Sequence, residues 1–430
     1  MVMTCRNGEV FSSHALFIKS ELVAFHVGRP HFINDLGRSH GRPFLCPDRG
    51  DGCPSNGKRQ QKPEHIMTNH QASAQPSSAD ATTPAEAHPR SIADEEQILK
   101  DPGRYRVLTG DRPTGRLHLG HYFGTLQNRV LLQCLGVETF VLIADFQVLT
   151  DRDVADRLVE TVEGLILDYL AVGLDPDRST IFAHSAVPAL NQLLLPFLSL
   201  VSVAALGRKP TVKDEIANSR QSSVSGLMFT YPAHQAADIL FCKANLVPVG
   251  QDQLPHLELT RTIARRFNGR YASGADIFPE PEAILSAAPL LLGTDGAKMS
   301  KSRGNAIALS DNADETARLI RGTKTDSLRH ITYEPAARPE ISSLVLLAAL
   351  CLDRDPHDVA EDIGSGGAGL LKRTVTEAVN EYLAPLRARR TKYEQDRGYV
   401  RKVLRQGNER ANAVADATLD EVRIAMNSSY

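Results

Sequence analysis

Short apolar runs alternate with helically spaced apolar residues from about residue 104 onward. The largely apolar runs Tyr105–Gly110, Phe140–Ala144 and Ser179–Ala183 predict buried strands. Between the last two, a helix capped by Asp151 is predicted from apolar residues three or four positions apart: Val154, Leu158, Val162, Leu165 and Tyr169. Strands that alternate with helices predict an α/β fold with a doubly wound parallel sheet. Such a sheet binds its ligands at the carboxyl ends of its strands.

The first hundred residues have a different pattern. Residues 1–66 show no sustained period, and a run rich in Ser, Thr, Ala and Pro follows Met67. Such composition does not bury enough apolar surface to order a chain. We therefore expect residues 1–100 to be a low-order N-terminal extension, in which either translation starts at Met67 or residues 1–66 are dispensable.

The rest of the chain divides into two predicted domains. Residues 101–305 hold the alternating strands and helices, and residues 306–430 read as mainly helical. Proline and glycine disfavour helix interiors. The helical stretch is therefore expected to break at Pro385, Gly398 and Gly407.

Charge and cysteine spacing narrow the class of protein. The formal net charge of −2 argues against a polybasic nucleic-acid binder and leaves room for a local basic face. The six cysteines form no paired framework, which is typical of the reducing cytoplasm. Cys46 and Cys53 are the closest pair, but their spacing is not usual for zinc, so we expect no metal site. No apolar run reaches the ~18 residues of a membrane span.

Two segments carry the candidate chemistry, and the first is Thr109–His121. A predicted strand, a glycine-bearing turn and a helix start bring backbone N–H groups together with the imidazoles of His118 and His121. Helix N-termini attract anions, and glycines let a nucleotide approach the backbone closely. Histidines three residues apart share one helix face. Taken alone, this pair is equally compatible with an ordinary structural role.

The second segment is Lys298–Ser302, which lies among glycines at 293, 296 and 304. Two lysines on a glycine-hinged loop can bind a triphosphate and neutralise the charge that develops on departing pyrophosphate. A solvated basic loop is the alternative for this segment alone. Both segments in one chain, in this order, favour a shared nucleotide site.

Together the two segments resemble the hallmark motifs of class I aminoacyl-tRNA synthetases. More narrowly, four stretches resemble bacterial tryptophanyl-tRNA synthetases: Thr109–Thr125, Thr230–Leu240, Leu246–Gln253 and Glu258–Arg261. The resemblance covers about residues 104 to 426. It implies a Rossmann-like catalytic domain over residues 101–305 and a C-terminal α-helical tRNA-binding domain over residues 306–430.

The implied activity is that of a tryptophan–tRNA ligase. ATP, accompanied by Mg²⁺, would adenylate L-tryptophan and release pyrophosphate, and tryptophan would then pass to the 3′-terminal ribose of tRNA(Trp). The tryptophan carboxylate attacks the α-phosphate, so catalysis consists mainly of positioning and charge stabilisation. The resemblance also implies a cytoplasmic homodimer without a membrane anchor. The long apolar stretch Leu193–Leu206 is the expected interface.

For tryptophan, the resemblance implies that Asp238 accepts the indole N–H and that Gly110, Gln235 and Gln253 belong to the same site. An unpaired buried N–H costs ~1–3 kcal/mol, so a pocket for indole needs an acceptor. The apolar contacts are expected from Leu108, Val247 and Val249.

For ATP, the resemblance implies four catalytic residues: His118, His121, Lys298 and Lys301. The implied binding residues are Arg112, Pro113, Thr114, Gly120, His121, Gly250, Gln251, Asp252, Leu290, Lys298, Met299, Ser300, Lys301 and Ser302. Four positions depart from the commonest family pattern, which has Gln at Arg112, Asn at His121, Met at Gln235 and Glu at Gln251. These departures put the finer pocket geometry in doubt.

Three alternatives remain open from the sequence. A tyrosine–tRNA ligase shares the motifs and also uses Gln near position 235. A nucleotidyltransferase shares the histidine motif but is typically shorter and lacks the C-terminal helices. A non-catalytic paralogue is disfavoured because both motifs are intact.

The tRNA contacts are expected among basic residues of the C-terminal helices: Arg387, Arg389, Arg390, Lys392, Arg397, Arg401, Lys402 and Arg405.

Overall fold

The computed structural model describes residues 2–4, 10–12, 89–90, 97–150, 157–208, 225–250, 253–273, 275–285 and 291–430. The predicted start at Met67 and the predicted cap Asp151 lie outside these residues. The division into domains at residues 100 and 305 stays a prediction.

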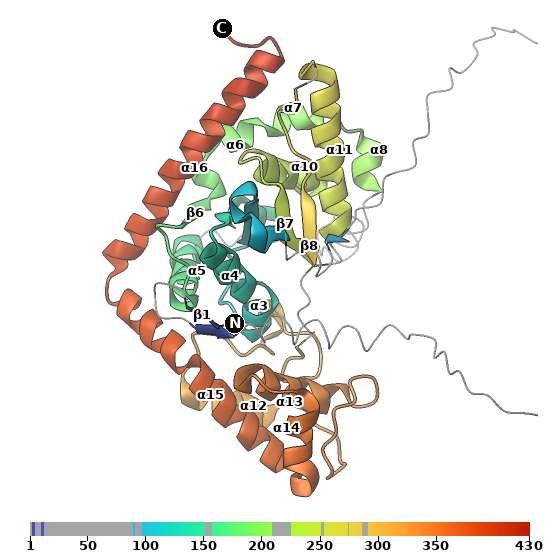
Figure 1. Ribbon diagram of the computed structural model, residues 1–430, viewed down its shortest axis with the longest axis vertical. Coiled ribbons are helices and arrows are strands. Elements are labelled where there is room, and N and C mark those ends of the chain that lie inside the picture. The colour runs from blue at the N-terminus through green and yellow to red at the C-terminus, as the bar shows by residue number, and fades with distance from the viewer. Residues whose placement is uncertain are drawn as a thin grey trace, which may run out of the picture. The chain divides into compact units, whose positions relative to one another are not determined.

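A parallel sheet organises the fold (Figure 1). Its strands lie in the order β3 (Pro89–Arg90), β8 (Glu282–Leu285), β7 (Leu246–Val249), β4 (Arg106–Asp111), β5 (Glu138–Ile143) and β6 (Ser179–Ala183). The three strands predicted from the sequence are β4, β5 and β6, so that prediction is confirmed. A short antiparallel pair, β1 (Val2–Thr4) and β2 (Val10–Ser12), is separate from this sheet.

Helices cover both faces of the sheet, as doubly wound connections require. Because side chains alternate along a strand, β5 sends Val141 and Ile143 into one core and Phe140 and Leu142 into another. The first core contains residues of α3 (Leu119–His121), η2 (Tyr122–Leu126), α4 (Gln127–Leu135) and α5 (Leu158–Val172). The second contains residues of α6 (Pro188–Gln192), α7 (Leu194–Leu198), α8 (Val203–Gly207), α10 (Gly226–Leu240) and α11 (Leu254–Tyr271). The α/β prediction is therefore confirmed.

The connections and the chain beyond the sheet complete the described elements. Short helical turns are η1 (Pro102–Arg104), η3 (Phe146–Thr150), η5 (His184–Ala186), η7 (Lys301–Arg303) and η8 (Gly364–Gly366). The C-terminal helices are α12 (Ala313–Gly322), α13 (Pro339–Leu352), α14 (Pro356–Ile363), α15 (Gly367–Glu394) and α16 (Arg397–Ala425). None of the described helices has the length and apolar character needed to cross a membrane.

The predicted helix breaks at Pro385 and Gly407 are wrong. Helix α15 continues through Pro385, and α16 begins just before Gly398 and continues through Gly407. Gly407 is a packing residue, because a Cβ there would lie within bonding distance of the backbone oxygen of Ile181 in β6. The absence of a side chain lets α16 approach the edge strand, along which it runs in Figure 1.

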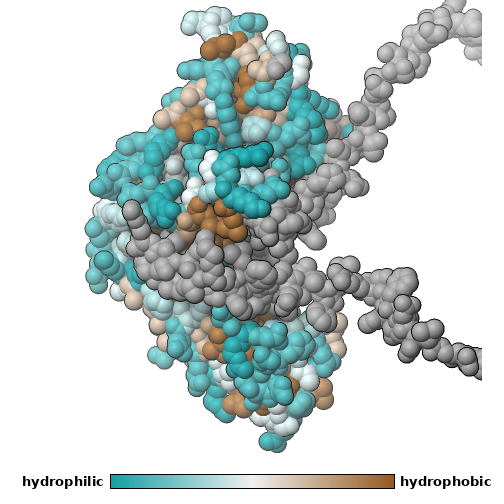
Figure 2. All heavy atoms as spheres, in the orientation of Figure 1, coloured by the Kyte–Doolittle hydropathy of each residue, from teal (hydrophilic) through white to brown (hydrophobic). Residues whose placement is uncertain are grey.

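The surface and the cysteines add two observations. The face drawn in Figure 2 is mostly hydrophilic over the coloured residues, with apolar residues in small groups. Cys242 and Cys351 are free, whereas Cys134 is disulfide-bonded. The sequence predicted no paired framework of cysteines, and the disulfide of Cys134 departs from that prediction because sequence spacing does not report which thiols the fold brings together.

Candidate active site

The turn after β4 is shaped by glycine. A Cβ on Gly110 would lie 2.3 Å from the backbone oxygen of Leu142 in β5, so the strands approach closely only because Gly110 has no side chain. The amide of Thr114 donates to the oxygen of Arg112 (2.8 Å), and Gly115 has φ +141°. This turn delivers the chain to His118, the N-cap of α3, at the carboxyl edge of the sheet.

The two histidines of α3 lie against each other. Their ring centroids are 3.7 Å apart, and the backbone N–H of His118 donates to Nδ1 of His121 (3.3 Å). A neutral imidazole whose Nδ1 accepts carries its proton on Nε2, so His121 keeps one N–H donor. Burial, with the charge of Lys301, lowers the pKa of His118 to about 4, and burial beside His118 lowers the pKa of His121 to about 3.

We expect both imidazoles of the free protein to stay neutral at pH 7 and to gain a proton only near pH 4 and pH 3. An unfolded histidine has a pKa of about 6.5, so the unfolded chain binds protons that the folded chain does not as the pH falls below that value. Both residues therefore lower the stability of the free protein as the pH falls from about 6.5 toward their folded pKa values. An NMR titration of ¹³C-labelled histidine tests this, with His118→Gln and His121→Gln assigning the signals. Titration of either ring near its unfolded value contradicts the expectation.

The lysine loop is joined to the histidine segment by backbone hydrogen bonds. The N–H of Leu119 donates to Ile307 (3.0 Å), and the N–H of Leu309 donates to Leu117 (2.9 Å). Lys301 extends across the turn, with its Cδ 3.8 Å from the position that a Cβ would take at Gly115. The two motifs, about 180 residues apart in the sequence, thus lie side by side.

Asn305 fixes the conformation of the lysine loop by bonding to residues within the loop and just before it. The sequence alone did not predict this role. Its Oδ1 accepts from the N–H of Ser300 (2.9 Å), and its Nδ2 donates to Asp295 Oδ1 (2.7 Å) and to the backbone oxygen of Lys298 (3.2 Å). The side chain is buried. A polar residue directly after Gly304, which has φ +66°, is the sequence signal that could have indicated this role.

Two cavities flank the histidine segment and receive most of the predicted site residues. The first, about 410 Å³, is lined by Gly110, Arg112, Gly120, His121, Gln235, Asp238, Gly250 and Gln253 among others. The second, about 640 Å³, is lined by Pro113, Thr114, His118, Ser300 and Lys301 among others. Lys298 is exposed and Met299 packs into the core, and neither lines these two cavities. Gln251, Asp252, Leu290 and the side chain of Ser302 lie outside the described residues.

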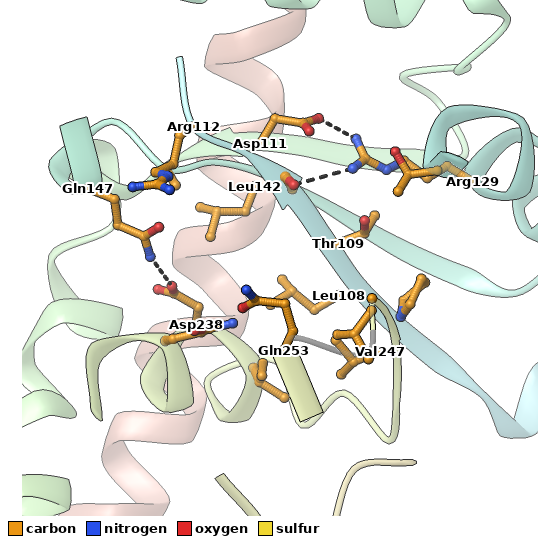
Figure 3. Close-up of a pocket in the computed structure, with 18 of the residues that line it drawn as sticks. Leu108, Thr109, Asp111, Arg112, Arg129, Leu142, Gln147, Asp238, Val247 and Gln253 are labelled. Carbon is orange, nitrogen blue, oxygen red and sulfur yellow. Dashed lines mark hydrogen bonds and ion pairs between the residues drawn. The ribbon is translucent and has the colours of Figure 1, made fainter. Parts of the chain in front are cut away.

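The first cavity combines apolar side chains with polar ones, among them the buried carboxylate of Asp238. Leu108, Val247 and Val249 line it, as predicted, and Asp238 of α10 is 1% exposed. Figure 3 shows Gln147 pointing at the Asp238 carboxylate, and its Nε2 donates to Oδ2 at 3.4 Å. A cavity of this size, with an apolar part beside polar groups, suits a small ligand that carries an apolar ring and hydrogen-bonding groups.

A buried ion pair between Arg129 and Asp111 stabilises the end of β4, where the turn toward His118 begins. The sequence alone did not predict this pair. Arg129, only 2% exposed, donates to Asp111 Oδ2 (2.6 Å) and to the backbone oxygen of Gly110 (3.2 Å); the hydroxyl of Tyr169 donates to the same Oδ2 (2.7 Å). Figure 3 shows both bonds of Arg129. Burial alone raises the pKa of Asp111, but the charge and hydrogen bond of Arg129 outweigh burial and hold that pKa well below its usual range.

A second buried carboxylate ties the C-terminal helices to the histidine segment. Asp168 accepts from the N–H of Leu117 (3.4 Å) and from Nε of Arg390 in α15 (2.8 Å). Arg389 likewise donates to the backbone oxygen of Ala171, 2.7 Å away. These arginines were candidate RNA contacts, and the structure gives them partners inside the protein instead.

Comparison with known proteins agrees with this geometry. Residues 100–384 match the family model of class I tRNA synthetases of the tryptophan and tyrosine type. The chain is 44% identical to the tryptophan–tRNA ligase of Streptococcus agalactiae over 337 residues, which cover 75% of this chain and 98% of the relative. It is 41% identical to the tryptophan–tRNA ligase of Clostridium longisporum, over 75% of this chain and 97% of the relative.

A solved structure shares the architecture. Tryptophanyl-tRNA synthetase from Campylobacter jejuni, crystallised with ADP and tryptophan, superposes with a TM-score of 0.66 at 28% identity and covers 75% of this chain and 99% of its own. The relatives are matched along almost their whole length, and the two cavities are lined by most of the residues that the family resemblance implied. The chain therefore belongs to the class I tryptophanyl-tRNA synthetases.

Proposed function

We propose that this chain uses ATP to convert L-tryptophan to tryptophanyl-AMP and pyrophosphate, and then transfers tryptophan to the 3′-terminal ribose of tRNA(Trp). The proposal rests on one observation: the histidine segment Thr109–His121 and the lysine loop Lys298–Ser302 lie side by side. Lys301 reaches the turn beside His118, and the cavity that contains Asp238 begins at the same turn. One cavity for the amino acid and one for the triphosphate thus adjoin at the point where the bond must form.

Tryptophan occupies the 410 Å³ cavity in this proposal. The indole ring packs between Leu108 and Val247, and its N–H donates to Asp238. The polar residues Gln253 and Gln235, with the backbone of Gly110, complete the pocket and orient the amino and carboxylate groups. A single buried acceptor selects indole because a side chain without a donor would leave that acceptor unpaired.

ATP extends from this cavity into the second one. Helix α3 presents the Nε2–H of His121 to the phosphates, because Nδ1 of this ring already accepts from His118 and a neutral imidazole then donates through Nε2. Lys301 neutralises the negative charge that builds on the α-phosphate and on departing pyrophosphate. The tryptophan carboxylate attacks phosphorus directly, so the protein supplies position and charge rather than a nucleophile.

Magnesium enters this scheme with ATP. Asp168 is a buried carboxylate that lines the same cavity as Lys301, and it already accepts hydrogen bonds from Leu117 and Arg390. This fits an ion that is held chiefly by the ATP phosphates rather than by a dedicated protein cage. When bound, Mg²⁺ neutralises phosphate charge, and the chain's own contribution remains that of Lys301 and the α3 donors.

We further propose a cytoplasmic homodimer with a C-terminal tRNA-binding domain over residues 306–430. Within the predicted interface, Leu195 and Val203 are 75% and 74% exposed, whereas Leu193 and Phe197 are buried. Exposed aliphatic residues on neighbouring short helices suit a self-complementary apolar contact. For tRNA, the exposed members of the predicted set of basic residues are Lys392, Arg401, Lys402 and Arg405, all on α15 and α16. Of these, Arg401 also pairs with Glu163.

Exchange of labelled pyrophosphate into ATP tests the reaction. We expect exchange that requires tryptophan and fails with tyrosine. In Asp238→Ala, the preference for tryptophan over tyrosine and phenylalanine should fall about 10- to 100-fold, which corresponds to about 1–3 kcal/mol for the unmade hydrogen bond. Asp416→Ala, at an exposed position of α16, is the matched control and should behave as the parent protein. Exchange with tyrosine alone would refute the proposal.

A further inference from the structure

A histidine that does not line either cavity makes the shortest contact to Asp238. His184 follows β6 in η5 and is fully buried, and its Nε2 lies 2.5 Å from Asp238 Oδ1. The two residues are 54 positions apart in the sequence, and neither motif of the family includes His184. It stands behind the carboxylate, on the side away from the space that the substrate would fill.

Two aromatic rings lie against the imidazole of His184. Phe146 stacks against the ring at 6.3 Å between centroids and 23° between planes, and the ring of His234 lies 4.7 Å away. Asn191 fixes the backbone and the neighbouring ring together: its Nδ2 donates to the oxygen of His184 (2.9 Å), and its Oδ1 accepts from His234 Nε2 (2.8 Å). The ring therefore has little freedom to turn away from Asp238.

The helix α16 holds the backbone on either side of His184. Asn408 accepts from the N–H of Ala183 (3.0 Å), and Asn412 donates to the oxygen of Ala186 (2.7 Å). These contacts give the end of β6 partners that an edge strand otherwise lacks. The position of the His184 ring is thus determined from its own backbone as well as from the rings around it.

The hydrogen-bond roles follow from chemistry. An ionised carboxylate only accepts, so Nε2 of His184 carries the proton that it donates to Oδ1. The other nitrogen, Nδ1, has no hydrogen-bond partner among the described residues, which suits a neutral ring with an unprotonated Nδ1. Within the described part of the chain, Oδ2 of Asp238 accepts only the long 3.4 Å bond from Gln147, which leaves it a lone pair for a donor in the cavity.

We propose that His184 is the positioning residue for tryptophan selection: by binding Oδ1 of Asp238, it turns Oδ2 toward the cavity to accept the indole N–H. The proposal rests on the function proposed above and adds the group that orients its specificity residue. His184 acts through Asp238 and does not touch the substrate. Without that bond, the buried carboxylate is free to rotate, and the geometry of the indole contact is lost.

A metal ion is the other use of this cluster, because His184, His234 and Asp238 bring ligand atoms within 4.8 Å of one another. The contacts argue against it. Nε2 of His184 and Oδ1 of Asp238 are in direct hydrogen-bonding contact, so no ion fits between them, and Nε2 of His234 is engaged by Asn191. His184, His234 and Asp238 are therefore arranged as hydrogen-bonding groups rather than as ligands of one metal ion.

The test compares tryptophan with 3-benzothienylalanine, which has the same ring shape but sulfur in place of the N–H. The readout is the ratio of kcat/KM for the two amino acids in ATP–pyrophosphate exchange. His184→Gln and His184→Met have side chains of the same length, and only glutamine keeps an N–H near the position of Nε2. We expect the ratio to fall about tenfold in His184→Met, through a higher KM for tryptophan. His184→Gln should restore most of the ratio.

The ratio in His184→Met decides the inference. A lower ratio supports it, whereas an unchanged ratio, including equal losses of kcat/KM for both amino acids, would show a merely structural role and overturn it. Thr418→Val removes another buried hydrogen bond of the same core and should leave the ratio intact. If His184→Met does not fold, His184→Asn replaces it, because its shorter amide does not reach Oδ1.

The Asp238→Ala variant separates this inference from the function on which it rests. A lower ratio in Asp238→Ala with no change in His184→Met would overturn the role of His184 and leave the proposed function standing. An unchanged ratio in Asp238→Ala itself would refute the role of Asp238, and with it the proposed mode of tryptophan recognition.

Discussion

Lys301→Ala should slow tryptophan-dependent ATP–pyrophosphate exchange by roughly 10²- to 10³-fold, the usual cost of removing one preorganised group that stabilises charge in a transition state. Lys301 lies across the nucleotide turn beside Gly115 and lines the cavity that His118 also lines. Burial lowers the pKa of Lys301, while the carboxylates of Asp111 and Asp168 oppose that effect. The ammonium is thus held in a site where its charge acts strongly.

The loss should fall on kcat rather than on the KM for tryptophan. Charge on the phosphates builds up as the bond to pyrophosphate breaks, so the contact from Lys301 strengthens in the transition state and contributes little to binding of the amino acid. Lys402→Ala, at an exposed position of α16, is the control and should leave the exchange rate unchanged. A rise in the tryptophan KM with an unchanged kcat would contradict the role given to Lys301.

Arg129→Met should lower the free energy of unfolding by about 3–5 kcal/mol, because it leaves the buried carboxylate of Asp111 without its cationic partner. Tyr169 still donates to that carboxylate, but a neutral hydroxyl does not replace the charge. The folded pKa of Asp111 is held below its unfolded value of about 3.9, so its ionised form stabilises the protein above that pH. The contribution is lost as the pH falls toward the folded pKa.

A double variant distinguishes a missing partner from a cavity. Urea unfolding is followed for Arg129→Met, for Asp111→Leu, and for the two together. If the unpaired charge is the main cost, the double variant should be more stable than Arg129→Met alone, since replacing both members of a buried pair with apolar groups is often close to neutral. Additive losses in the double variant would argue against the ion pair as the cause.

The sequence identified the strands and the two motifs because these are local patterns. Tyr105–Gly110, Phe140–Ala144 and Ser179–Ala183 appear in the structure as β4, β5 and β6 within one residue or two of their predicted ends. Leu108 and Val247 line the cavity expected for tryptophan, together with Asp238. A run of apolar residues, or a glycine turn before a helix, has the same physical consequence wherever it occurs.

Helix continuity was predicted wrongly because tertiary contacts override local preference. Pro385 and Gly407 both disfavour a helix interior, yet α15 and α16 continue through them. At Gly407 the reason is visible, since α16 lies so close to β6 that no side chain fits. Packing of α16 against the edge of the sheet compensates for the helix propensity that Gly407 costs.

The sequence by itself determined the fold class, the positions of three strands of the sheet and many of the residues that line the two cavities, because periodicity and motif chemistry are properties of neighbouring positions. Only the tertiary structure decided which buried polar groups pair: Asp111 with Arg129, Asp168 with Arg390, and Asp238 with His184. Each partner comes from a distant element, and a buried charge or donor must find a partner somewhere in the folded core. The spacing of residues along the sequence does not reveal these pairs. They depend on which side chains the packed sheet and helices bring within hydrogen-bonding distance.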